Sequence, residues 1–448
     1  MAAESLGAVS QAVSVDNLEI PLIDFEAFLT GDASIKQETA NAILSGFQRA
    51  GFIYLRNFGI NSKAVAQAFA QSAKFFERPL AQKEELTWTT PEANRGYVRQ
   101  GREKTSDCVD AADVDQQRAL EGEDLKETMD IGREGDGFDN HWPDAFDDAG
   151  KVFKQEMLSF FDRCKELHME IMRAVAVGLG IQETWFDSFC DAGDNTLRLL
   201  HYPAVSAEVF EKNKLQVRAG AHTDYGSITL LFQDMAGGLQ VQSPTGSFVD
   251  ATPIADTMVV NAGDLLARWS NETIKSTKHR VVEPPNRKLV DGIHPARYSI
   301  AYFCNPNFDR MIEAIREYTI CPGPSSWLTQ AAGTYDDVRV KKYEGINRSV
   351  YMCASWSKLT NPQWKVPRPA ISRDILSRRG AHAGGLFPVI TTELHEVSPC
   401  IEGHPHRSPP TARPQHKYTI GAELHTQLTY KEGLCGSFVG PLYEARRT

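Results

Sequence analysis

The sequence lacks the features that mark a membrane protein or a secreted protein. No run approaches the roughly 18 consecutive apolar residues that a membrane span needs. The first 16 residues contain no basic segment followed by an apolar stretch, so no secretory signal is expected. Eight cysteines are spread without paired spacing, which favours unpaired thiols in a reducing compartment. These absences predict a cytoplasmic protein.

Positive charge is also scarce. Lys and Arg number 48 against 58 Asp and Glu, which gives a net charge of −10. An acidic chain is a poor match for nucleic acid or an anionic membrane surface, so we expect neither as a partner. The remaining expectation is an enzyme with a small-molecule substrate, whose oligomeric state the sequence leaves open. With 448 residues, 42% of them hydrophobic, the chain is long enough for a large core in one or two domains.

Residues 1–185 have a mixed pattern that predicts an α/β region. Ile20–Phe25 and Gly51–Asn57 are rich in strand-forming residues, and Lys36–Arg49 between them has helical apolar spacing. Val152–Gly178 predicts a long amphipathic helix, because apolar residues recur at steps of three and four. We interpret that apolar stripe as core packing.

The pattern changes in residues 186–345, where short strand-like runs are separated by Gly, Asp and Pro. Strands at this spacing are typical of an all-β barrel or a double-sheet jelly roll. The runs are LRLLHY, SITLLFQ, GLQVQ, TMVVN, KHRVVE and RYSIAYF, all between Thr196 and Asn305.

Residues 346–448 differ from the rest of the chain in charge and in proline content. Lys and Arg outnumber Asp and Glu there, and prolines recur at a spacing that interrupts any helix or central strand. We predict an atypical Pro-rich tail, partly disordered, with an irregular insertion at about 348–415.

A possible metal site lies within the predicted jelly roll. His222 and Asp224 are two residues apart, a spacing that puts both side chains on one side of a strand. His279 follows within another strand-like run. Two histidines and one carboxylate, with positions left open, form the facial arrangement of Fe(II) oxygenases, although the same ligands can hold zinc. The plain alternative is an Asp that caps a turn beside two core histidines.

Arg297 and Ser299 open the next strand-like run and share one face by the same two-residue spacing. A guanidinium and a hydroxyl together suit a carboxylate ligand. An arginine at the start of a barrel strand is more often a charge at the rim, and that alternative stays open from the residues alone.

Several segments resemble the isopenicillin N synthase-like family of 2-oxoglutarate and Fe(II) dioxygenases. The similar segments are AHTDYGSITLLFQD, NAGDLLARWSN, STKHRVVEPP and RYSIAYFCNPN, with IPLIDF and GFIYLRNFGI nearer the N-terminus. The resemblance implies a mostly β core with flanking helices, a double-stranded β-helix. It also implies that Fe(II), 2-oxoglutarate and dioxygen take part in the reaction. The implied iron ligands are His222, Asp224 and His279, and the implied 2-oxoglutarate contacts are Arg297, Ser299 and Tyr202. Some members of the family use no 2-oxoglutarate.

Within this family the chain is most similar to thymine dioxygenases, through WTTPEANRGY, GDNTLRLLHYPAV and the four longer segments above. That similarity places substrate contacts at Arg198, Tyr225 and Phe303. Two aromatic faces can enclose a flat ring while a guanidinium donates to its carbonyls. Each residue also has a plainer interpretation: Arg198 paired with an acid, Tyr225 capping a turn, Phe303 in the core. We therefore predict oxidation of a small planar nitrogen heterocycle, with two alternatives: a secondary-metabolite hydroxylase or desaturase, and an inactive barrel that serves as a binding protein.

The C-terminal region departs from the family pattern. Relatives usually finish with a Lys-Tyr segment and a helix. Here KYEGIN (Lys342–Asn347) runs into the proline-rich stretch, and Lys417-Tyr418 with Thr419–Lys431 is the better match. The sequence between them resembles nothing in the family, so the effect of this tail on activity is open.

Overall fold

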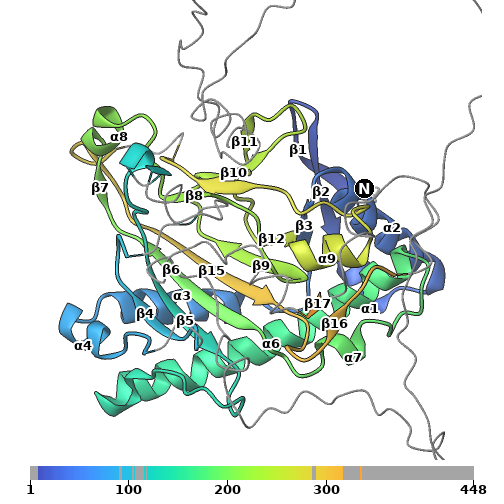
Figure 1. The fold of residues 1–448 in the computed structure, drawn as a ribbon, viewed down its shortest axis with the longest axis horizontal. Coiled ribbons are helices and arrows are strands. Elements are labelled where there is room, and N and C mark those ends of the chain that lie inside the picture. The colour runs from blue at the N-terminus through green and yellow to red at the C-terminus, as the bar shows by residue number, and fades with distance from the viewer. Residues whose placement is uncertain are drawn as a thin grey trace, which may run out of the picture. The chain divides into compact units, whose positions relative to one another are not determined.

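Two β-sheets face each other in the computed structural model (Figure 1). The structure describes residues 9–89, 93–102, 105, 116–117, 119–284, 289–315 and 333–334, and the predicted tail and both Lys-Tyr segments lie outside them. The large sheet has the order β1-β2-β3-β12-β9-β15-β6-β5-β4, and the small sheet has the order β11-β10-β13-β8. The strands of the large sheet are β1 (Val9–Val15), β2 (Leu18–Asp24), β3 (Phe52–Arg56), β12 (Thr257–Ala262), β9 (Ile228–Gln233), β15 (Arg297–Cys304), β6 (Thr196–Tyr202), β5 (Glu127–Gly132) and β4 (Gly96–Val98). Those of the small sheet are β11 (Phe248–Asp250), β10 (Leu239–Gln242), β13 (His279–Val281) and β8 (Ala219–His222).

This arrangement is the predicted double-stranded β-helix, and the fold class is confirmed. Each of the six strand-like runs of the sequence contains a strand, namely β6, β9, β10, β12, β13 and β15. Neighbouring strands in both sheets are antiparallel, except that β2 and β3 run parallel. The described residues also form two short pairs, β7 (Val205–Ser206) with β14 (Ile293–His294) and β16 (Met311–Ile312) with β17 (Gly333–Thr334).

Helices pack against the face of the large sheet that points away from the small sheet (Figure 1). The longest is α6 (Asp148–Gly178), which begins where the Asp147 carboxylate accepts a hydrogen bond from the backbone N–H of Gly150. Its predicted apolar stripe is buried. The ring of Phe161 packs edge-on against the ring of Tyr302 on β15, with 5.0 Å between the ring centres. The other helices are α1 (Glu26–Thr30), α2 (Ala33–Arg49), α3 (Ser62–Phe76), α4 (Leu80–Glu85), α7 (Asp187–Cys190), α8 (Glu208–Lys212) and α9 (Asp264–Trp269), with the 3₁₀ helix η1 (Pro143–Ala145).

The large sheet crosses the predicted boundary between residues 185 and 186. From the N-terminal side, β3 pairs with β12 and β5 pairs with β6. All described residues also belong to one compact unit. The division into two regions therefore stays a description of the sequence pattern, and the two regions share one sheet.

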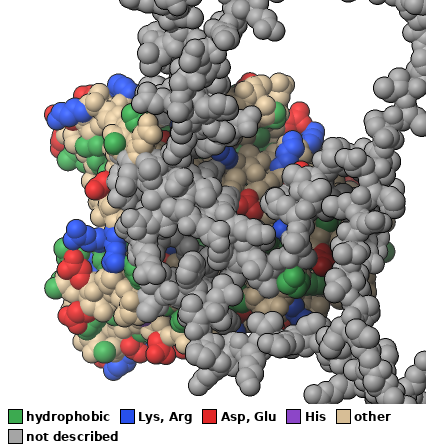
Figure 2. Space-filling model, in the orientation of Figure 1, with side chains coloured by type: hydrophobic (Ala, Val, Ile, Leu, Met, Phe, Trp, Pro, Cys, Tyr) green, Lys and Arg blue, Asp and Glu red, His purple; other side chains and the backbone are tan. Residues whose placement is uncertain are grey.

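Three cysteines lie in the described part of the chain, Cys164, Cys190 and Cys304, and all three are buried and unpaired. Burial raises the pKa of the Cys164 and Cys304 thiols well above the usual value. Within the described ranges, no helix has the length and apolar character to cross a membrane. Figure 2 shows acidic and basic side chains interspersed on the part of this face whose residues are described.

Candidate metal and co-substrate site

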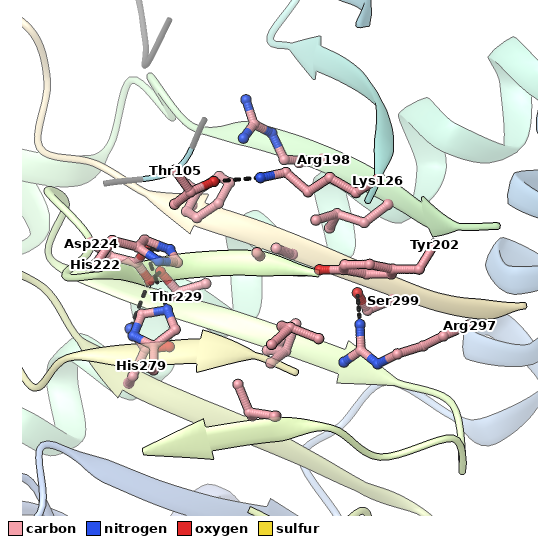
Figure 3. A pocket seen from close by; sticks show the side chains of 18 residues that line it. Thr105, Lys126, Arg198, Tyr202, His222, Asp224, Thr229, His279, Arg297 and Ser299 are labelled. Carbon is pink, nitrogen blue, oxygen red and sulfur yellow. Dashed lines mark hydrogen bonds and ion pairs between the residues drawn. The ribbon is translucent and has the colours of Figure 1, made fainter. Parts of the chain in front are cut away.

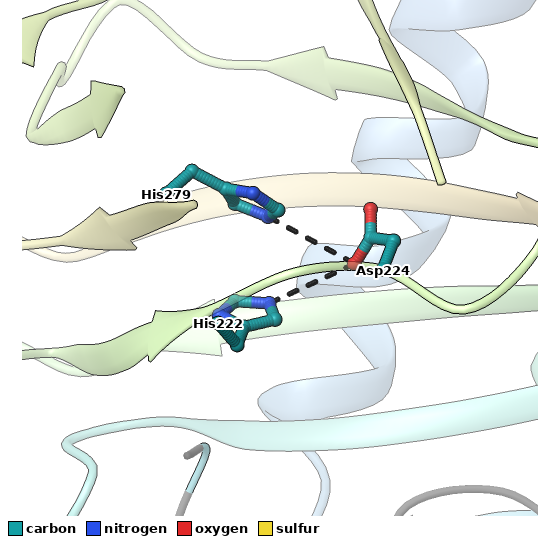
Figure 4. Close-up of side chains that lie close together, drawn as sticks. All are labelled: His222, Asp224 and His279. Atoms are coloured by element: carbon teal, nitrogen blue, oxygen red, sulfur yellow. Dashed lines mark ion pairs between the residues drawn. The ribbon is translucent and has the colours of Figure 1, made fainter. Parts of the chain in front are cut away.

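The three predicted metal ligands converge at one end of the space between the sheets. His222 ends β8 and His279 begins β13, and the two are direct cross-strand partners. Asp224 follows two residues after the end of β8. One Asp224 carboxylate oxygen, Oδ1, lies 3.7 Å from His222 Nε2 and 3.8 Å from His279 Nε2 (Figure 4). One ligand atom from each residue lies within 4.8 Å of the others, close enough to share an ion.

Backbone carbonyls orient both imidazoles. His222 Nδ1 is 2.9 Å from the carbonyl oxygen of Gly220, and His279 Nδ1 is 3.3 Å from that of Thr277. A carbonyl can only accept, so this pattern assigns the proton to Nδ1 in each ring. The unprotonated Nε2 atoms then face Asp224 and are available as metal ligands.

The carboxylate of Asp224 is buried and held by two donors. Its second oxygen, Oδ2, accepts from the Thr229 hydroxyl at 2.5 Å and from the Asn261 side-chain amide at 2.7 Å. Burial on its own would raise the pKa of Asp224, but the two imidazoles and these hydrogen bonds lower it below the usual value. Asp224 is therefore an anion near neutral pH, as a metal ligand must be.

A cavity extends from these residues between the two sheets (Figure 3). Alternate residues of each strand point into it, as the two-residue period of a strand requires. It is lined by Thr105, Lys126, Arg198, Leu200, Tyr202, Ala219, His222, Asp224, Thr229, Leu231, Leu239, Asn261, His279, Val281, Arg297, Ser299, Ala301 and Phe303.

Arg297 lies at the other end of this cavity and is buried, with 1% of its surface exposed. Its guanidinium donates to Ser299 Oγ at 3.0 Å and to the carbonyl oxygen of Gly237 at 3.0 Å, and it lies 4.7 Å from the centre of the Tyr202 ring. Its hydrogen-bond partners in the described part of the chain are all uncharged. A buried cation without an anion is unfavourable unless a ligand supplies one. This end of the cavity therefore suits a carboxylate.

The three predicted substrate contacts are not all in the cavity wall. Arg198 and Phe303 line it, and the Arg198 guanidinium lies 5.6 Å from the centre of the Phe303 ring. Arg198 also forms a two-pronged ion pair with Asp130 of β5, with both N···O distances at 2.7 Å. Tyr225 is buried in the apolar cluster beside α6 and is not among the cavity-lining residues. The proposed stacking of a ring between Tyr225 and Phe303 stays a prediction.

Four polar lining residues were not predicted. Thr229 and Asn261 hold Asp224, as described above. Thr105 and Lys126 meet across the cavity wall, where the Lys126 ammonium also lies 3.0 Å from Asp124 (Figure 3). Asn261 stands in a segment that carried part of the family resemblance, so its position could have drawn attention. Lys126 has no comparable signal in the sequence.

A double-stranded β-helix with two histidines and a carboxylate at one end of its cavity, and a buried arginine at the other, defines an Fe(II)- and 2-oxoglutarate-dependent dioxygenase. Family models agree. Residues 193–306 match the 2OG-Fe(II) oxygenase superfamily, and residues 20–145 match the N-terminal domain described as non-haem dioxygenase in morphine synthesis. The chain belongs to the 2OG-Fe(II) oxygenase superfamily, and Fe(II) and 2-oxoglutarate are its cofactor and co-substrate.

Similar proteins occur both among solved structures and among curated proteins. The crystal structure of full-length thymine 7-hydroxylase of Neurospora crassa with alpha-KG is 56% identical, has a TM-score of 0.67, and covers 74% of this chain and 98% of its own. A second structure of the same protein, also 56% identical and with the same TM-score and coverage, contains alpha-KG and thymine. Among curated proteins, a 2-oxoglutarate-Fe(II) type oxidoreductase, ppzD of Metarhizium rileyi, is 34% identical over 66% of this chain and 83% of its own length.

Proposed function

We propose that His222, Asp224 and His279 bind Fe(II), and that Arg297, Ser299 and Tyr202 bind the distal carboxylate of 2-oxoglutarate. The single observation that supports this most directly is one cavity with the three convergent ligands at one end and the buried Arg297 at the other. The bound iron and 2-oxoglutarate supply the oxidising chemistry, in which dioxygen is consumed and succinate and carbon dioxide are formed. The protein holds the co-substrate and the target in one enclosed space, which fixes their mutual orientation.

We propose further that the target is a small planar nitrogen heterocycle, a thymine-like pyrimidine or a related ring. The relationship to the Neurospora thymine 7-hydroxylase, at 56% identity, supports this substrate class. Phe303 and Arg198 stand in the cavity wall as the two partners that such a ring needs, an aromatic face and a donor to a ring carbonyl. Tyr225 is proposed as the second ring face. It would have to present that face from the apolar cluster that it occupies in this structure.

The charges around Arg198 favour a neutral substrate over an anionic one. Arg198 is paired with Asp130, and Lys126 in the same wall is paired with Asp124. Each of these cations therefore already faces a buried carboxylate, in contrast to Arg297. A neutral ring with carbonyl oxygens can accept hydrogen bonds here without a further charge being buried. We expect a pyrimidine dione to be preferred over a pyridine carboxylate.

The experiment is a substrate screen that measures succinate. The purified enzyme with Fe(II) and 2-oxoglutarate is supplied with thymine, other pyrimidines or pyridine carboxylates. We expect thymine-like rings to stimulate succinate release. Replacing Arg198 with Lys should weaken apparent affinity for the ring by roughly 10- to 100-fold, the equivalent of a charge-assisted bond. Arg56→Lys is the matched control, because Arg56 pairs with Asp24 at 3.2 Å between two strands that do not line the cavity.

A second candidate function has one specific observation in its favour. The curated relatives at 30–34% identity include 2-oxoglutarate-dependent dioxygenases and a proline hydroxylase, buaE of Petromyces alliaceus. The heterocycle proposal fails if no flat heterocycle stimulates turnover, or if Arg198→Lys leaves the apparent affinity for the ring unchanged. The proposed function is then that of a secondary-metabolite hydroxylase or desaturase. A protein that binds neither Fe(II) nor 2-oxoglutarate would instead be an inactive binding protein. A cytoplasmic location and the absence of nucleic-acid and membrane partners remain part of this proposal.

A further inference from the structure

We infer that Thr229 and the segment Asn261–Asp264 are positioning residues, which direct one oxygen of Asp224 to the metal and withhold the other. This segment joins the end of β12 to the start of α9. The inference concerns the metal centre and is independent of which substrate the enzyme oxidises.

Hydrogen bonding makes the two oxygens of Asp224 unequal. Oδ2 accepts from Thr229 Oγ1 at 2.5 Å and from Asn261 Nδ2 at 2.7 Å, while Oδ1 is the atom that faces both histidine Nε2 atoms. Thr229 and Asn261 are 4% and 2% exposed, so water does not compete with them appreciably. Two short bonds to one buried oxygen use its lone pairs and hold the plane of the carboxylate.

The segment Asn261–Asp264 also holds the backbone of residues 224–227, which we call the metal-ligand loop. The N–H of Asp264 donates to the carbonyl oxygen of Asp224 at 2.8 Å, and the N–H of Gly263 donates to that of Ser227 at 2.9 Å. A Cβ atom on Gly263 would lie 2.3 Å from the carbonyl oxygen of Gly226, so only glycine permits this close approach. The stretch Asn261–Asp264 thus contacts both the side chain and the main chain of Asp224, and Thr229 supplies the second donor to the side chain.

One consequence concerns the number of coordination positions of a bound ion that the protein leaves open. A carboxylate that binds through both oxygens occupies two positions of a six-coordinate ion, whereas one that binds through Oδ1 occupies one. With the two histidines, a single-oxygen Asp224 would leave three positions of a six-coordinate ion open to ligands that the protein does not supply. Thr229 and Asn261 thus keep the coordination number contributed by the protein at three.

The test compares Thr229→Val, which replaces the hydroxyl by a methyl group of similar size, with Thr229→Ser, which keeps the hydroxyl and loses the methyl group. Mn(II) affinity is measured by titration in the absence of substrate and 2-oxoglutarate. We expect T229V and Asn261→Leu to bind Mn(II) about 10- to 100-fold more weakly than the unmodified protein, the usual effect of losing a group that orients a metal ligand. T229S should stay within about threefold of it, since its hydroxyl is retained.

Two further measurements separate positioning from general stability. The absorption spectrum of bound Co(II) depends on coordination number, and it should change in T229V and in N261L. Thr39→Val is the control, because Thr39 is a buried threonine of α2 whose hydroxyl donates only to the helix carbonyl of Ile35. T39V should lower the melting temperature without changing Mn(II) affinity or the Co(II) spectrum. The inference is overturned if T229V binds Mn(II) as tightly as T229S; should N261L fail to fold, the Thr229 pair decides alone.

Discussion

Individual buried charges in this protein are held by several partners at once, and the carboxylate of Asp224, the proposed metal ligand, is one of them. Because its Oδ2 receives both hydrogen bonds, an asparagine at this position should keep its carbonyl oxygen on Thr229 and Asn261. The amide nitrogen would then face the two histidines, where it cannot act as a ligand. Asp224→Asn should therefore remove the metal site while it keeps the hydrogen bonds to Thr229 and Asn261, which truncation of the side chain would lose.

We expect Asp224→Asn to lose stoichiometric Fe(II) binding and all succinate release while the protein still folds. Iron content after anaerobic loading and gel filtration is the measurement, with the circular dichroism spectrum as the test of folding. Asp250→Asn on β11 is the control, since Asp250 accepts a hydrogen bond from Gln240 and does not line the cavity. Full iron content in the Asp224 variant would mean that the ligand assignment is wrong.

A second buried cluster at the residue scale is formed around Glu127. Its carboxylate accepts from Lys83 Nζ at 2.9 Å and Tyr97 Oη at 2.5 Å, and it lies 2.7 Å from His201 Nδ1. Burial alone would raise the pKa of Glu127, but these three hydrogen bonds lower it. Removing Lys83 would leave the buried carboxylate of Glu127 without its ammonium partner.

Lys83→Met should therefore lower the free energy of unfolding by about 3–5 kcal/mol. Lys151→Met is the comparison, because Lys151 and Asp148 form an exposed pair and such pairs contribute only about 0–1 kcal/mol. Denaturant unfolding of both variants measures the difference. An equal loss of unfolding free energy in the two variants would show that the buried Glu127 cluster stabilises the protein no more than an exposed ion pair does.

The residues of the site that could be predicted from sequence are those with regular spacing. His222 and Asp224, and likewise Arg297 and Ser299, are two residues apart, and a strand period turns that spacing into a shared face. Asn261 lies 37 residues from Asp224, and its contact depends on the order of strands in the sheet. No local pattern encodes that order. Arg198 shows a related limit, because its pairing with an acid was foreseen only as a plain alternative, and the sequence did not identify that acid as Asp130.

Among the elements, the helix α6 connects the core to the metal-ligand loop through His168. The buried His168 Nε2 lies 3.1 Å from Ser227 Oγ, and Ser227 donates its own proton to the carbonyl oxygen of Cys304. The imidazole Nε2 is therefore the donor, and Nδ1 has no hydrogen-bond partner in the described structure. A second proton would have to be placed on this buried Nδ1. Burial accordingly lowers the pKa of His168 to about 3.

This shift predicts how stability depends on pH. Between pH 6.5 and about 3 the unfolded chain binds a proton at His168 that the folded chain does not, so stability falls as the pH falls, by about 1.4 kcal/mol per pH unit. In His168→Gln, the dependence of the free energy of unfolding on pH should be weaker between pH 6.5 and 5, by an amount that corresponds to about one bound proton. Urea unfolding at several pH values is the measurement. Ser227→Ala, which keeps the buried imidazole, should retain the slope, and an unchanged slope in His168→Gln would contradict the assignment.

Strands were predicted well where β-branched and aromatic residues cluster, and poorly elsewhere. The six runs from β6 to β15 were found because their apolar residues follow strand patterns. β8 has the sequence AGAH, which carries no strand propensity, and its pairing with β13 is what makes it a strand. β5 has the sequence ETMDIG, and its acidic residues are buried only because Lys83 and Arg198 pair with them. Tertiary contacts determine both of these elements.

At the scale of the whole molecule, the metal and 2-oxoglutarate should act as stabilising ligands of the folded state. A ligand at 100 times its dissociation constant raises the free energy of unfolding by about 2.7 kcal/mol. Anaerobic thermal melting should show one upward shift with Fe(II) and a second with 2-oxoglutarate, both reversed by a chelator. Arg297→Met should keep the first shift and lose the second, whereas Arg56→Met should keep both. A full 2-oxoglutarate shift in Arg297→Met would contradict the assigned carboxylate site.

The shared sheet has a consequence for any attempt to isolate the catalytic half of the protein. In the folded protein β12 is covered by β3 through Thr257–Asn261, and β6 is covered by β5 from Thr196 to His201. A fragment that begins at residue 186 would uncover the hydrogen-bonding edges of both strands, on either side of the cavity. Open edges of this kind recruit strands from other molecules, so such a fragment should precipitate as intermolecular β-structure. The first 185 residues therefore protect the edges of the strands that carry the chemistry, through β3 and β5.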